Sequence, residues 1–170
     1  ISHLFNSNQI KSKSDLYYNN LIDEFSSKSI ITKRIFINHS SVNVKEITDD
    51  LIIGKSTVLN EFVIRMLQLK EFIFLLSRSI FRDKYKIEKR LSFYSSIEAL
   101  SYSTLSNLRI YFFLKKLLKT HSPKLLITTF EGHAYERIVF KLVNSTPYTI
   151  SAGYQHAAIF KDQYSIKRKL

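Results

Sequence analysis

The chain has 170 residues, a hydrophobic content of 45% and no cysteine. Such a composition supports a folded core and excludes disulfides and thiolate metal sites. The formal net charge of +12 is compatible with three kinds of anionic partner: nucleic acid, an anionic membrane surface, or a phosphorylated or acidic substrate. A Lys-rich composition bias accounts for the charge equally well, so charge alone does not select a function class.

The N-terminus lacks the pattern of a signal peptide, and the apolar segments contain too many charges for a membrane span. We therefore expect a cytoplasmic protein, or one held peripherally at the inner face of the cytoplasmic membrane. Residues 1–14 are polar and predict a loose lead-in. No clear element closes the chain before Leu170, so we expect residues 1–170 to be a single, partial domain of a longer protein.

The first half of the chain predicts a short amphipathic helix over residues 15–25 and a strand over residues 30–38. Residues 42–53 fit either a short strand or a turn of helix, and Gly54 ends them. A long helix then begins at a Ser56 or Thr57 cap and reaches about Phe81, with an apolar density that predicts burial on more than one side. The end of this helix and the residues after it form a basic cluster, which consists of Arg78, Arg82, Lys84, Lys86, Lys89 and Arg90. The cluster fits two interpretations, a solvated basic tip or a contact with an anionic bilayer.

A second helical region over residues 87–120 is expected to break near residues 101–106. After it, residues 124–130 predict a strand, residues 132–144 a helix, and residues 148–152 a second strand opened by Pro147. Together they predict a βαβ unit. The expected fold class is α/β, a Rossmann-like open and mostly parallel sheet flanked by helices, with a long helical segment in the middle of the chain.

Polar clusters follow both strands of this unit. Parallel strands have their carboxyl ends at one edge of the sheet, where open α/β sheets bind ligands. We therefore expect the two clusters to face each other; they are Glu131, Gly132 and His133 after the first strand, and Gly153, Tyr154, Gln155 and His156 after the second.

Two roles for Glu131 fit the sequence, and the neighbouring residues favour the second. Thr128 and Glu131 have the spacing of a capping box, which places the carboxylate in the first turn of the helix. Alternatively, Glu131 is a general base beside His133 and His156, with space for a ligand at Gly132. Tyr154 and Gln155 would then supply an aromatic face and a bidentate amide to the ligand.

Glu136 and Arg137 lie one helical turn after His133. Glu136 is spaced to orient the imidazole, and Arg137 to reach an anionic ligand or Glu131, although pairing within the helix explains both. His133, Glu136 and His156 also form a weak metal-ligand pattern, but without a His-Glu-x-x-His run we expect no metal site. Neither a glycine-rich dinucleotide fingerprint nor a P-loop is present.

Two separated motifs carry a resemblance to a known family: Thr129-Phe130-Glu131-Gly132-His133-Ala134-Tyr135-Glu136-Arg137 and Gly153-Tyr154-Gln155-His156. This pattern resembles that of bacterial surface-carbohydrate biosynthesis proteins. It is similar to capsule and O-antigen glycosyltransferases of the two-domain GT-B architecture, related in style to Kdo and sialic acid transferases. Tyr135 stands where the pattern usually has tryptophan, and residues before Pro123 contribute nothing to the resemblance.

The resemblance implies an N-terminal, acceptor-side domain of an inverting glycosyltransferase. Glu131 would be the base that deprotonates the acceptor hydroxyl, His133 and His156 would lie near the carboxylate or phosphate of the donor, and Glu136 with Arg137 would support the site. The donor would be a sugar nucleotide, for example a CMP-linked one, bound mainly by a second domain, and the acceptor a glycan or lipid-linked glycan. The fragment alone would be inactive.

Two noncatalytic alternatives remain open from the sequence. One is a basic nucleic-acid-binding module, which is disfavoured because the aromatic residues fall mostly at apolar-periodic positions. The other is a membrane-surface scaffold within a polysaccharide assembly complex.

Overall fold

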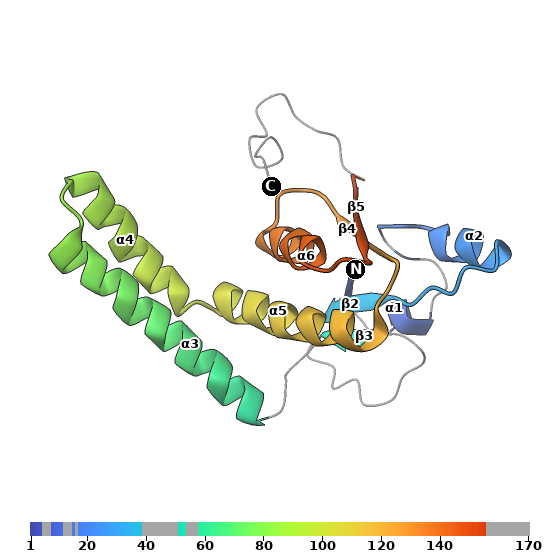
Figure 1. The fold of residues 1–170 in the computed structure, drawn as a ribbon, viewed down its shortest axis with the longest axis horizontal. Helices are drawn as coiled ribbons and strands as arrows, with labels where there is room; N and C mark the ends of the chain where they lie inside the picture. The colour runs from blue at the N-terminus through green and yellow to red at the C-terminus, as the bar shows by residue number, and fades with distance from the viewer. Residues whose placement is uncertain (5–7, 12–14, 16, 39–50, 54–57, 156–170) are drawn as a thin grey trace. The chain divides into compact units, whose positions relative to one another are not determined.

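The computed structural model describes residues 1–4, 8–11, 15, 17–38, 51–53 and 58–155 (Figure 1). By its internal contacts the chain divides into two compact units. The first unit comprises Ile1–Gly54 and Ile110–Leu170, and the second comprises Lys55–Arg109. The described residues form a mixed α/β structure with small parallel sheets.

The first unit contains a three-stranded parallel sheet in the order β1-β2-β3. The strands are β1 (Ser2–Leu4), β2 (Ile35–Asn38) and β3 (Leu51–Ile53), and β2 pairs with both neighbours. Ile35, Phe36 and Ile37 are all buried. Such a continuous apolar run is typical of a parallel strand that is covered on both faces.

The predicted βαβ unit is confirmed in the second half of this unit. Strand β4 (Leu125–Thr129) is followed by α6 (Ala134–Asn144) and β5 (Ile150–Tyr154), and the two strands pair in parallel. Helix α6 buries Tyr135, Val139 and Val143, which are spaced at four-residue intervals and form one stripe in the hydrophobic core. Residues from the last turns of α5 (Tyr102–His121) join the same core.

The N-terminal segment is more structured than its composition predicts. Residues 1–14 contain β1 and the short helix α1 (Asn8–Lys11), so a loose lead-in is the wrong description of them. The helix predicted over residues 15–25 begins later, as α2 (Leu21–Ser27). Asp15 and Asn19 exchange two backbone hydrogen bonds, and Asn19 has a φ of 50°, a left-handed conformation that ends the helical pattern before α2.

The first-half strand is also shorter than predicted, since only Ile35–Asn38 pairs and Ile31 is exposed. The ambiguous segment over residues 42–53 ends in β3, so the strand alternative is correct for Leu51–Ile53. Residues 42–50, Gly54 and the predicted caps Ser56 and Thr57 lie outside the described residues.

The second unit is built on a hairpin of two helices that lie side by side (Figure 1). Helix α3 (Val58–Ser77) continues into a π-helical turn, η1 (Arg78–Arg82), and the chain returns along α4 (Lys86–Ala99). The break predicted within the second helical region, near residues 101–106, falls at Leu100 and Ser101, between α4 and α5. No helix in the described ranges combines the length and apolar character that a bilayer-spanning segment needs.

The prediction that the long helix is buried on more than one side is wrong. Helix α3 buries only Ile64 and Gln68 among its described residues, because within this unit its main partner is the single helix α4. Helix α4 contributes the small residues Ser92, Ser96 and Ala99 to the buried side. Small side chains let two helices approach closely, but they cover little of the apolar surface of the partner.

Candidate functional site

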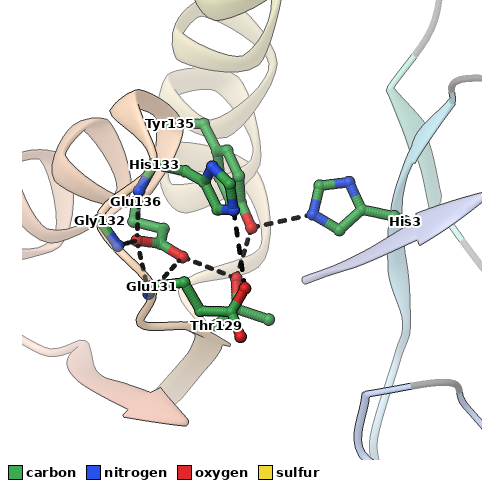
Figure 2. A network of polar contacts seen from close by, with 7 residues as sticks. All are labelled: His3, Thr129, Glu131, Gly132, His133, Tyr135 and Glu136. Carbon is green, nitrogen blue, oxygen red and sulfur yellow. Dashed lines mark hydrogen bonds and ion pairs between the residues drawn. The ribbon is translucent and has the colours of Figure 1, made fainter. Parts of the chain in front are cut away.

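The loop between β4 and α6 is held by one buried carboxylate. Glu136, which is 1% exposed, accepts hydrogen bonds from the backbone amides of Glu131 (3.0 Å), Gly132 (2.7 Å) and His133 (2.9 Å) (Figure 2). The hydroxyl of Thr129 donates to the same carboxylate over 2.8 Å. Hydrogen bonds to an ionised group are stronger than neutral ones, so this carboxylate sets the backbone path of the loop.

This arrangement corrects the predicted capping box. Helix α6 begins at Ala134, so Glu131 lies before the first turn and Thr128 does not cap the helix through it. The capping carboxylate is Glu136, the third helical residue, which binds the amide of the N-cap residue His133. Gly132, with a φ of 94°, makes the tight turn between them. The carboxylate of Glu136 therefore holds backbone amides, whereas the sequence left two roles open for it, orienting the imidazole of His133 or pairing within the helix.

Glu131 and His133 form a pair at the open side of this loop. The Oε2 atom of Glu131 lies 3.7 Å from Nε2 of His133, and their side chains are 19% and 57% exposed. The imidazole stacks on the ring of Tyr135 with 5.7 Å between centroids and an interplanar angle of 13°. The pair thus presents a carboxylate and a stacked imidazole at the carboxyl end of β4.

A chain of hydrogen bonds runs from β1 to the buried carboxylate (Figure 2). Nε2 of His3 lies 2.9 Å from the hydroxyl of Tyr135, which also bonds the hydroxyl of Thr129. Because Thr129 donates its proton to the ionised Glu136, Tyr135 must donate to Thr129, and His3 must then carry a proton on Nε2 and donate it to Tyr135. Burial is the main cause that raises the pKa of Tyr135, which keeps this hydroxyl protonated.

No sequence signal pointed to His3 and Tyr17 as members of the site. Thr129 and Tyr135 belong to the motif that carries the family resemblance, but no role in the site was predicted for them. The ring of His3 lies 5.3 Å from the ring of Tyr17, and burial raises the pKa of Tyr17, with the charge of Glu131 the next cause. His3 belongs to a three-residue strand, too short for a periodic signal. Thr129 could have been identified from its position as the last residue of β4. Polar residues that end an apolar strand in a βαβ unit are expected at the edge of the sheet where ligands bind.

The β5 side of the site is partly described. The pairing of Thr129 with Tyr154 places the ends of β4 and β5 at one edge, as predicted, and the amide of Phe130 donates to the carbonyl of Tyr154 over 2.9 Å. The ring of Tyr154 lies 5.3 Å from that of Tyr18, and the half-buried Gln155 follows it. His156 lies outside the described residues, so its predicted approach to Glu131 stays a prediction.

Gly153 is explained by the aromatic residues around it. A Cβ atom at this position would lie 2.9 Å from Cβ of Phe130 and 3.3 Å from Cζ of Phe140. Glycine is therefore needed at this position of β5 for close packing against Phe130 and Phe140. A direct contact between Gly153 and a ligand stays a prediction.

Arg137, which the sequence predicted to reach an anionic ligand or Glu131, is exposed on α6. Within the described residues no group of three or more His, Asp or Glu side chains is close enough to hold a metal ion. The site as described consists of one partly exposed carboxylate, an adjoining imidazole and a rigid loop, which suits proton transfer at a bound hydroxyl group.

No protein-family model matches the chain, and no curated protein and no solved structure is significantly similar to it.

Proposed function

We propose that this chain is the acceptor-side domain of an inverting glycosyltransferase that uses a sugar nucleotide to build a bacterial surface polysaccharide or its lipid-linked precursor. The observation that carries the proposal is the Glu131–His133 pair, with 3.7 Å between Oε2 and Nε2, at the carboxyl end of a parallel strand. The resemblance of residues 129–137 and 153–156 to surface-carbohydrate glycosyltransferases supplies the reaction class.

The fold supports this proposal through one contact between the two sheets of the first unit. The nitrogen of Ile1 donates to the carbonyl of Ile127, with 2.5 Å between the atoms, which brings the start of β1 beside β4. We propose that the five strands belong to one open sheet in the order β3-β2-β1-β4-β5. That order is the one found in Rossmann-like domains, which bind ligands at the carboxyl ends of their strands.

In the proposed reaction the carboxylate of Glu131 accepts the proton of the acceptor hydroxyl. The hydroxyl oxygen attacks the anomeric carbon of the donor, the bond to the nucleotide phosphate breaks, and the nucleotide leaves with the electron pair. A single displacement of this kind inverts the configuration at that carbon. His133 positions the carboxylate, Glu136 fixes the loop, and Arg137, Tyr154, Gln155 and His156 are proposed to contact the substrates.

The test is turnover by the full-length protein with a panel of UDP-, GDP- and CMP-linked sugars and polysaccharide fragments as acceptors, with release of the nucleotide as the readout. Replacing Glu131 by Gln is expected to lower kcat on the order of a hundredfold or more, because removal of a general base has this effect. Donor affinity, measured by calorimetry, should remain unchanged. Glu24→Gln, an exposed site on α2, is the matched control and should retain full turnover.

Wild-type turnover in Glu131→Gln would remove the catalytic role from this carboxylate while leaving the transferase proposal intact. Failure of every donor to release its nucleotide in the presence of every acceptor would count against the transferase itself.

A further inference from the structure

The turn of the α3–α4 hairpin combines cations with exposed apolar side chains. Here the tip of the hairpin means residues 78–94. All six of its cations are exposed; they are Arg78, Arg82, Lys84, Lys86, Lys89 and Arg90. Exposed among them are large apolar and aromatic side chains, namely Ile80, Phe81, Tyr85, Ile87, Leu91, Phe93 and Tyr94.

The acidic groups of the tip neutralise only part of this charge. The described tip contains two carboxylates, and Asp83 is buried, where it pairs with Arg78 at 3.3 Å and accepts a hydrogen bond from Ser92. Glu88 is at the third position of α4 and accepts from the amide of Tyr85 over 3.4 Å. The outward surface of the tip is therefore strongly positive.

Internal contacts give the tip a defined shape. Asp83 bonds both η1 and α4 through Arg78 and Ser92, and its own amide donates to the carbonyl of Arg78 over 2.9 Å. The hydroxyl of Ser79 donates to the carbonyl of Lys89 over 2.8 Å. A partner therefore meets an apolar and basic surface that is already formed, with little ordering cost on binding.

We propose that the tip of the hairpin is a docking element that binds the surface of an anionic phospholipid bilayer. Exposed aromatic and aliphatic side chains enter the boundary between headgroups and acyl chains, while Lys and Arg extend their long stems to the phosphates. A protein partner fits less well, because lysine is depleted at the cores of protein interfaces and three of the six cations are lysines. The proposal is independent of the transferase activity.

The test is co-sedimentation of the chain with vesicles of phosphatidylcholine, with and without phosphatidylglycerol. Binding is expected only to the anionic vesicles and should weaken as salt is added. The triple change Lys84→Gln, Lys86→Gln and Lys89→Gln should weaken it on the order of a hundredfold, since each cation near such a surface contributes about a fivefold gain. The matched control is Lys116→Gln, Lys119→Gln and Lys141→Gln, which removes the same charge from exposed sites in the first unit.

A second pair of variants tests the apolar part. Phe81 and Ile87 are 82% and 69% exposed, so replacing both by Ser should not disturb the fold, and we expect vesicle binding to fall about tenfold or more. Ile31→Ser with Tyr148→Ser is the control, because these side chains are 93% and 81% exposed outside the tip. Circular dichroism of each variant checks that the helices are retained.

Three outcomes would overturn the proposal. Equal losses in the tip and control triples would show that only the net charge matters. Absence of vesicle binding, together with oligonucleotide binding that the tip triple abolishes, would identify nucleic acid as the partner. Absence of vesicle binding, together with a dimer that Phe81→Ser and Ile87→Ser disperse in sedimentation velocity, would identify a second copy of the chain.

Discussion

The loop before α6 and the tip of the hairpin differ in where most of their charged side chains lie. In the loop, Glu136 is buried and bonds three backbone amides and a hydroxyl, so a charged residue organises the polypeptide. At the tip, six cations and several aromatic side chains are exposed. The buried carboxylate of Glu136 holds the loop in one conformation, whereas the exposed cations of the tip contribute to the binding of an anionic partner more than to folding. Substitutions should therefore affect stability in the loop more than in the hairpin.

The largest effect is expected at Glu136. Replacing it by Ala leaves three amides and the hydroxyl of Thr129 without their acceptor, and we expect the free energy of unfolding to fall by about 3 to 5 kcal/mol. Urea denaturation measures this change. Glu71→Ala, an exposed site on α3, should change stability by less than about 0.5 kcal/mol. Similar losses in both variants would contradict the difference between the regions.

Gly153 should rank next. In Gly153→Ala the new Cβ meets Phe130 at 2.9 Å, so β4, β5 or the ring must shift, at a cost of about 1 to 3 kcal/mol. Gly132→Ala tests a different cause, since its φ of 94° strains any other residue, and should cost about 1 to 2 kcal/mol. If the contact with Cβ of Phe130 is the reason, Gly153→Ala should cost less stability in a Phe130→Gly background, where that Cβ is absent, than in the wild type.

Within the hairpin a neutral buried residue, Gln68, tests the weaker organisation of this region. Its amide nitrogen donates to the carbonyls of Ala99 (2.9 Å) and Ser101 (3.1 Å), and the side chain is buried. Gln68→Met preserves volume but removes both of these bonds and the one that Oε1 accepts from Arg65 over 3.2 Å, and we expect a loss of about 1 to 2 kcal/mol in thermal or urea unfolding. A loss equal to that of Glu136→Ala would show that the hairpin is as tightly organised as the loop.

The smallest effect concerns alkaline pH. Burial raises the pKa values of Tyr18 and Tyr135 above the ordinary value of 10.0. Above pH 10 the unfolded chain therefore releases tyrosine protons that the folded chain retains, so stability is complete below pH 10 and declines as pH rises from there toward the folded-state pKa values. The temperature at which half of the protein is unfolded should fall with rising pH, and it should fall less steeply in Tyr18→Phe and in Tyr135→Phe than in the wild type. An unchanged slope in both would contradict burial of these hydroxyls.

The local sequence determined the elements that have a periodic apolar pattern or are bounded by proline or glycine. The βαβ unit was predictable because β-branched runs, a four-residue apolar stripe and Pro147 agree along one short segment, and parallel pairing then dictates a common edge for Glu131 and Gln155. Gly132 and Gly153 were also informative, since each occupies a position where a side chain is strained or crowded.

Tertiary structure decided the roles of the polar residues. The spacing of Thr128 and Glu131 satisfies the capping pattern, yet Glu136 caps the loop, because the turn at Gly132 places the first helical residue at Ala134. His3 is more than one hundred residues from Tyr135 in sequence and bonds it only because β1 folds against the βαβ unit. The apolar periodicity of α3 predicted burial, but burial needs a partner surface, and the small residues of α4 leave most of α3 uncovered. Periodicity specifies which face a helix offers, whereas only the assembled chain specifies what covers it.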